Sequence, residues 1–189
     1  MTISKDIKNL IITNYNIKIH VISTSASEES KSRQCLPFLI NSLKKIGVKI
    51  TQSDIRDFTP IWVDDKELKE IPKEYYKLYS TVKKVDGVIL AFPVYNYTIS
   101  SAAKAISEII ADALEDKPVG FLVAAGSIRS HLVVAEFMKS MMFEQNTLCY
   151  PKFVMVTKED LIDNKLSQEL TKRIEEFAQG FAQFTKKNI

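Results

Sequence analysis

Residues 17–32 have the sequence IKIHVISTSASEESKS, in which a short apolar run gives way to small hydroxylated residues. The run 17–23 is rich in β-branched residues and bounded by polar ones, which is typical of a buried parallel strand. Residues 23–32, which we name the serine loop, are followed by an amphipathic helical pattern. A turn from strand to helix directs backbone N–H groups, hydroxyls and the positive end of a helix dipole to one point. We therefore expect the serine loop to bind an anion.

Strand and helix patterns alternate along the rest of the chain. We expect helices at 34–46, 73–85, 102–114, 131–145 and 166–184, and further strands at 48–55, 88–92, 119–124 and 153–157. Residues 56–72 contain two prolines and Trp62 and predict an irregular excursion, in which the tryptophan is either a packing anchor or a ligand contact. Five strands separated by helices indicate one α/β domain with a five-stranded parallel sheet, strand order 2-1-3-4-5, and helices on both faces.

Three loops follow the strands that meet where the strand order reverses, which is where such sheets bind ligands. The serine loop supplies candidate phosphate ligands in the hydroxyls of Ser25, Ser27, Ser30 and Ser32. The alternative is that these serines only form a turn and cap the next helix. No Gly-x-Gly-x-x-Gly motif follows the strand, which disfavours a dinucleotide held in the Rossmann manner and leaves a mononucleotide phosphate.

The second and third of these loops offer a surface for a flat ring. Pro93 stiffens the backbone beside Tyr95 and Tyr97, against which a planar heterocycle can lie. Tyrosines packed in the core or at a subunit interface are the alternative, and for Tyr97 both readings stay open. Gly126 in the third loop allows a ligand to approach the backbone closely, although glycine at a strand-end turn also has purely structural uses.

The composition argues against several classes of partner and site. Lys and Arg number 26 against 23 Asp and Glu and are spread along the chain, so nucleic acid is not expected. Cys35 and Cys149 form no Cys-x-x-Cys pair, so we expect free thiols, no metal site and a cytoplasmic location. No run approaches the ~20 apolar residues of a membrane span, and no membrane association is expected. Residues 1–16, an expected N-terminal extension, lack the apolar core of a signal peptide.

Several stretches together carry a likeness to a known family. Residues 25–32 have the pattern Ser-x-x-x-x-Ser-x-Ser, and residues 86–96 read DGVILAFPVYN. Lys104 follows in the next helix, and residues 125–132 combine Ala-Gly-Ser with His-Leu. In order, spacing and residue type the chain resembles the flavodoxin-like NAD(P)H-dependent FMN reductases, most closely the branch that supplies reduced flavin to sulfonate monooxygenases. Thr24 and the alanine of Ala-Gly-Ser depart from the pattern, because many members have glycine at these places.

The resemblance implies a flavodoxin-like FMN-binding domain over residues 17–189 that acts as an oxidoreductase. FMN would place its phosphate in the serine loop and receive a hydride from NADPH or NADH, which requires no catalytic side chain. The cofactor-binding residues that the resemblance implies are Ser25, Ser27, Ser30, Ser32, Pro93, Val94, Tyr95, Asn96, Gly126 and Ser127. It also implies a homodimer or homotetramer and, in the named branch, a flavin-dependent monooxygenase partner.

Two further expectations concern the flavin and two arginines. The helix at 131–145 lacks the extra residue that makes a π-bulge in some members, so we expect an uninterrupted helix and FMN retained as a prosthetic group. Arg33 and Arg129 are read as solvated surface residues, with a contact to the 2′-phosphate of NADPH as the alternative.

Two competing functions remain. A quinone, azo or metal-oxyanion reductase would keep the flavin and change the acceptor. An electron-transfer flavodoxin belongs to another class and ranks lower, because flavodoxins are usually strongly acidic and this chain has a net charge of +3.

Overall fold

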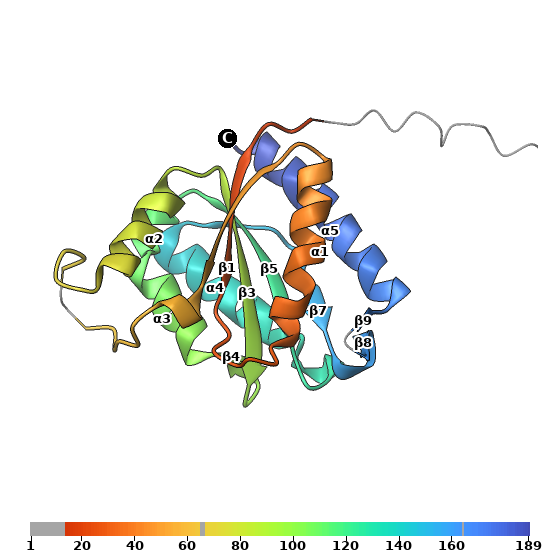
Figure 1. Ribbon diagram of the computed structural model, residues 1–189. Helices are drawn as coiled ribbons and strands as arrows, with labels where there is room; N and C mark the ends of the chain where they lie inside the picture. The colour runs from red at the N-terminus through yellow and green to blue at the C-terminus, as the bar shows by residue number, and fades with distance from the viewer. Residues whose placement is uncertain (1–13, 65–66, 164) are drawn as a thin grey trace, which may run out of the picture.

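The computed structural model describes residues 14–64, 67–163 and 165–189. A mostly parallel sheet forms the middle layer of the fold. Hydrogen bonding follows the order β2-β1-β3-β5-β7 (Figure 1), which confirms the strand order expected from the sequence. The strands are β1 (Lys18–Ser23), β2 (Lys49–Asp54), β3 (Gly87–Tyr95), β5 (Pro118–Ala124) and β7 (Val154–Val156). The central strands β3 and β5 are buried along most of their length because helices cover both of their faces.

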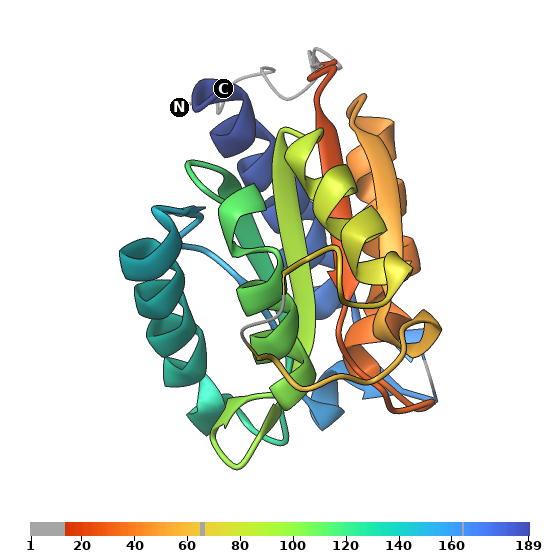
Figure 2. The ribbon, with the colours of Figure 1, turned by 90° about the vertical axis from the view of Figure 1, so that its left-hand side faces the viewer.

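Helices lie on both faces of the sheet (Figures 1 and 2). They are α1 (Lys31–Lys45) and α5 (Gln168–Lys187) on one face, and α2 (Lys73–Lys83), α3 (Ser101–Ile109) and α4 (Leu132–Gln145) on the other. Alternate residues of a strand point to opposite faces, so β1, β3 and β5 each contribute to two apolar clusters. Leu39 and Phe181 are fully buried in the first cluster, and Phe92 and Phe137 pack edge to face in the second, 5.5 Å apart. The uninterrupted helix expected for α4 is confirmed.

β3 is longer than predicted and ends in a hairpin. It continues to Tyr95 and pairs antiparallel with β4 (Thr98–Ile99). Asn96 and Tyr97 form the tip, with φ angles of 49° and 59°. Two successive left-handed residues make the turn whose twist suits a two-residue hairpin, and asparagine adopts this backbone far more readily than tyrosine. The sequence did not indicate the hairpin because glycine, the usual residue of such a tip, is missing.

The outer edge of the sheet also differs from the prediction. β6 (Leu148–Cys149) pairs with the start of β5 and β7 pairs with its end, so two short strands stand where one was expected. Pro151 lies between them and has no N–H group with which to continue the ladder. A separate hairpin of β8 (Leu161–Ile162) and β9 (Lys165–Leu166) then precedes α5.

The expected excursion after β2 is present. A short 3₁₀ turn, Ile55–Asp57, is followed by irregular chain up to α2 among the described residues. Trp62 is 91% exposed, so it is not a packing anchor within this chain. The described helices include none with the length and apolar character that a membrane crossing requires.

The chain before β1 packs on the domain where it is described. Tyr15 is buried, its N–H group donates to the carbonyl oxygen of Ile46, and its hydroxyl accepts a hydrogen bond from Gln179 of α5. Residues 1–13 of the expected N-terminal extension lie outside the described residues.

A histidine lies buried in the sheet. The His20 side chain on β1 is 2% exposed, and its ring nitrogens hydrogen-bond with Thr51 Oγ1 at 2.7 Å and Ser53 Oγ at 3.0 Å on β2. Burial lowers the pKa of His20 from 6.5 to about 4, because the charged imidazolium would lose its hydration. His20 is therefore neutral in the folded protein at neutral pH.

Acid will destabilise the fold through His20, because the unfolded chain takes up a proton there that the folded chain excludes. The contribution of the neutral imidazole to the free energy of unfolding is complete above pH 6.5. It is lost as the pH falls to about 4, and the total loss is about 3 kcal/mol. Denaturant unfolding of the wild type and of His20→Gln from pH 7.5 to 4 measures this loss, since glutamine offers hydrogen bonds without titrating. An equal loss of unfolding free energy in the two proteins would contradict the assignment of this acid effect to His20.

Candidate functional site

The serine loop, the end of β3 and the loop after β5 meet at the carboxyl edge of the sheet and line one open pocket of about 200 Å³. The residues of its wall are Ser25, Ser27, Glu29, Ser30, Lys31, Pro93, Val94, Tyr95, Ala124, Ala125 and Gly126. The serine loop therefore faces residues 93–95, which we name the Pro93 loop, and Gly126 across a single cavity. This is the arrangement that the strand order predicted.

The predicted site residues fall into two groups. Those that line the pocket are Ser25, Ser27, Ser30, Pro93, Val94, Tyr95 and Gly126. Ser32 is fully buried and lies outside the pocket wall. Asn96 is exposed at the hairpin tip and lines a neighbouring pocket of about 540 Å³, which shares Tyr95 with the first. Ser127 is half-buried where the 3₁₀ turn Ile128–Ser130 begins.

Ser30 has two roles at the start of α1. Its Oγ accepts a hydrogen bond from the Arg33 N–H group at 3.2 Å, which makes it the N-cap, and it lies 3.0 Å from Ser32 Oγ. The same residue lines the pocket. Helix capping, the alternative given for the serine loop, thus coexists at Ser30 with a position suited to a ligand.

Thr24 anchors the other end of the serine loop. Its N–H group and its hydroxyl both donate to the carbonyl oxygen of Ala91 on β3, at 2.9 and 3.2 Å. The side chain that replaces the family's glycine is therefore directed at the sheet and not into the pocket. The loop leaves β1 along a path fixed by β3.

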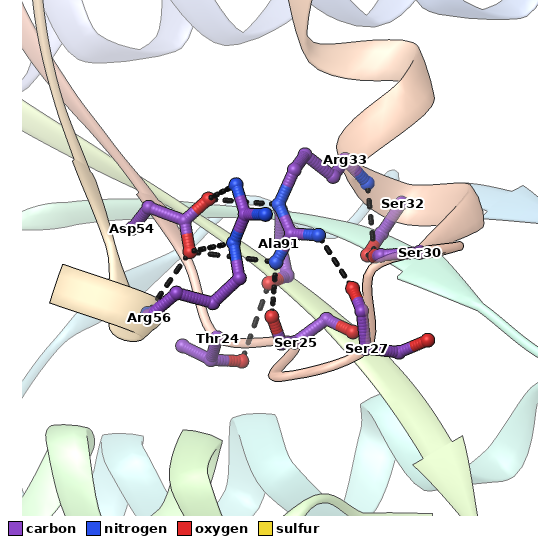
Figure 3. Close-up of polar contacts among 9 residues, drawn as sticks. All are labelled: Thr24, Ser25, Ser27, Ser30, Ser32, Arg33, Asp54, Arg56 and Ala91. Carbon is purple, nitrogen blue, oxygen red and sulfur yellow. Dashed lines mark hydrogen bonds and ion pairs between the residues drawn. The ribbon is translucent and has the colours of Figure 1, made fainter. Parts of the chain in front are cut away.

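Arg33 is the residue that sequence reasoning missed. Its side chain is 18% exposed, and its Nε donates to Asp54 Oδ2 at 2.7 Å (Figure 3). Nη1 donates to the carbonyl oxygen of Ser27 at 2.5 Å, and Nη2 donates to that of Ser25. The expectation of a solvated arginine was wrong. No sequence signal could have found these contacts, because the acceptors are backbone atoms and a carboxylate 21 residues away.

Asp54 is shared by two arginines. Arg56 also binds it, with Nη2 2.9 Å from Oδ2 and Nε 3.1 Å from Oδ1 (Figure 3). Partial burial alone would raise the pKa of Asp54, but hydrogen bonds from Arg56 and Arg33 outweigh it and hold the pKa below the ordinary value. Asp54 is therefore a carboxylate throughout the neutral range.

The Pro93 loop is the straight end of a strand and not a free loop. Pro93 is buried, Val94 is half-buried and Tyr95 is exposed, so the side chains grade from the core to the pocket mouth. Tyr97 is 67% exposed at the hairpin tip, which excludes the core reading for this tyrosine and leaves the interface reading open.

Gly126 leaves space at the third loop. A Cβ atom at this position would meet nothing within 4 Å, whereas at Gly120 it would lie 2.9 Å from the ring of Phe177. Packing within this chain therefore does not require glycine at 126. Nearby, His131 is exposed and its Nδ1 lies 3.1 Å from the carbonyl oxygen of Ile128, a local turn contact.

Residues 17–160 match the model of the NADPH-dependent FMN reductase family. The chain belongs to this family. Over 96 residues it is 31% identical to the NADH:(hydroxy)cinnamate reductase subunit CrdA of Vibrio ruber, and this alignment covers 49% of the chain and 46% of that protein. The match thus spans about half the length of that relative.

Solved structures share the fold. An oxidoreductase from Corynebacterium diphtheriae has a TM-score of 0.73 at 20% identity, with 93% of this chain and 100% of that chain covered. FerB, a flavoenzyme NAD(P)H:(acceptor) oxidoreductase from Paracoccus denitrificans, has a TM-score of 0.74 at 16% identity and coverage of 91% and 98%. The expected flavodoxin-like fold is confirmed.

Family membership makes FMN the cofactor and a reduced nicotinamide nucleotide the electron donor. The pocket fits this group. Serine hydroxyls and the N-terminus of α1 suit a phosphate, Lys31 adds a positive charge, and the open space above Gly126 admits a flat ring.

Valine in place of Gly126 will weaken FMN binding at least about tenfold, because its side chain enters the space that the flavin needs. Titration of flavin fluorescence gives the dissociation constant. Thermal unfolding of the flavin-free variant is the control. Its midpoint will match that of the wild type, since no protein atom lies within 4 Å of the new Cβ. An unchanged dissociation constant would place the flavin away from this loop.

Proposed function

We propose that this protein is an NAD(P)H-dependent FMN reductase that passes electrons on to a flavin or a small acceptor. The observation that carries the proposal is the pocket shared by the serine loop, the Pro93 loop and Gly126, in a chain of the FMN reductase family. When bound, FMN supplies the hydride chemistry, so the protein needs to supply only binding and orientation.

The phosphate end of the proposed site is the serine loop. Ser25, Ser27 and Ser30 line the pocket, and Lys31 stands at the first position of α1, where the helix dipole also favours an anion. Ser32 supports this end from behind through its hydrogen bond with Ser30. Three serines and one cation, with the Glu29 carboxylate beside them, thus border one small volume in which we place the phosphate group.

The ring end is formed by the other two loops. The backbone from Pro93 to Asn96 would lie against the flavin, and Gly126 and Ser127 would border its polar edge. Tyr95 stands exposed at this end, where it can cover a ring without closing the outer face to a nicotinamide. No acid or base is assigned, because hydride transfer between two stacked rings needs none.

The reduced flavin passes its electrons to a second molecule, the acceptor. A relative whose name describes a subunit of a larger reductase supports transfer to a protein partner, such as a flavin-dependent monooxygenase. Quinone, azo and metal-oxyanion reduction use the same reduced flavin and remain alternatives. The regular α4 supports FMN held as a prosthetic group.

The proposed location is the cytoplasm, and the proposed FMN-binding domain is residues 17–189 with residues 1–16 as an extension. Both cysteines are free, and burial raises the pKa of Cys35 to about 12, which keeps it an unreactive thiol. Free thiols and a nicotinamide reductant both suit a reducing compartment.

Flavin-dependent oxidation of NADPH or NADH is the expected result with the purified protein, followed by nicotinamide absorbance with and without added FMN. A visible spectrum recorded in parallel separates a bound flavin that bleaches from an exchanging one. If FMN binds but neither nicotinamide reduces it, the protein is an electron carrier. If FMN does not bind, the proposal fails.

The protein is expected to form homodimers or homotetramers through the outer face of α4. Leu132, Met142 and Phe143 are exposed there, and Phe143 is 88% exposed. Light scattering of the wild type at micromolar concentration will give at least twice the mass of one chain, and Phe143→Glu will shift it towards one. A wild-type monomer would rule out this expectation, and circular dichroism of the variant checks that it is folded.

A further inference from the structure

Arg33 holds the serine loop by its backbone. Its planar guanidinium group binds Asp54 through one edge and two carbonyl oxygens, those of Ser25 and Ser27, through its terminal nitrogens (Figure 3). The guanidinium group is planar and rigid. By binding three acceptors at once, it fixes the positions of these acceptors relative to one another. Arg33 is absent from the pocket wall, so its charge is not presented to a ligand there.

These contacts determine which way two peptide groups face. In a trans peptide the N–H group points opposite to the carbonyl oxygen, and the described chain has no cis peptide bond. Because the carbonyl groups of Ser25 and Ser27 face Arg33, the N–H groups of Ala26 and Glu28 face away from it. Asp54 lies on β2, on one side of β1, while the pocket lies towards β3 and β5 on the other side. The two N–H groups therefore point away from Arg33, in a loop whose Ser25 and Ser27 line the pocket.

We propose that Arg33 is a positioning residue that shapes the serine loop for the phosphate of FMN without touching that phosphate. The inference rests on the proposed function. Arg33 acts through the two carbonyl oxygens and Asp54 keeps it in place, while Lys31 supplies the positive charge at the pocket wall. Shape and charge at the phosphate end thus come from different residues.

Arg56 provides a matched control in the same cluster. It shares Asp54 with Arg33, but the hydrogen bonds of its side chain within the described chain go to that carboxylate and not to the serine loop. Lysine preserves the charge at either position, but a single ammonium group cannot span Asp54 and two carbonyl oxygens. Arg33→Lys and Arg56→Lys therefore differ in the loop contact and not in charge.

The test compares FMN with riboflavin, which has the same ring and no phosphate. Dissociation constants of both flavins are measured by fluorescence quenching in the wild type and the two variants. We expect Arg33→Lys to bind FMN at least about tenfold more weakly and riboflavin within about twofold of the wild type, and Arg56→Lys to bind both as the wild type does. Amide hydrogen exchange without flavin will be faster at residues 24–30 in Arg33→Lys alone.

Three results would overturn the inference, and they differ from one another. Arg33→Lys with wild-type affinity for FMN removes the positioning role and leaves the proposed function intact. An equal loss of both flavins in Arg33→Lys means that the residue supports the fold and not the phosphate end. A wild type that binds no FMN refutes the proposed function itself, and the positioning role with it.

Discussion

The register of β1 between its two neighbouring strands positions the serine loop, Asp54 and the pocket at the carboxyl edge of the sheet. Ser23 pairs with Asp54 of β2 and with Ala91 of β3, so the three strands are level where the serine loop leaves the sheet. This alignment puts a carboxylate on one side of the loop, where Arg33 can reach it, and the pocket on the other. A slip of one residue would turn every side chain of β1 to the opposite face and undo both.

The proposed phosphate end of the pocket depends on geometry more than on charge. Lys31 contributes a cation to the wall, but Glu29 stands in the same wall and Glu28 is its neighbour in the loop. Hydroxyls, N–H groups and a helix N-terminus must then provide most of the attraction, and such dipoles act only when they are aimed. The arginine and aspartate behind the loop are what keeps them aimed.

The local sequence pattern was sufficient to predict the strand order, the helices and the meeting of three chain segments at one edge. Each of these follows from apolar periodicity and from the rules of parallel sheets. It failed where long-range contacts decide. The bond from Arg33 to the serine loop joins a side chain to backbone atoms, which leave no trace in the sequence. Asn96 and Tyr97 form a tight turn without glycine, and Pro151 divides the outer strand, so neither feature matched a simple template.

Trp62 is the single tryptophan of the chain, and it stands in solvent on the excursion between β2 and α2. The excursion forms one wall of a cavity of about 830 Å³ whose other wall is α3. Indole emission from this protein is therefore a local optical signal. The emission reports the polarity around this one segment and is insensitive to the core. A molecule or subunit that covers Trp62 will shift the emission to shorter wavelength, because the indole then loses contact with water.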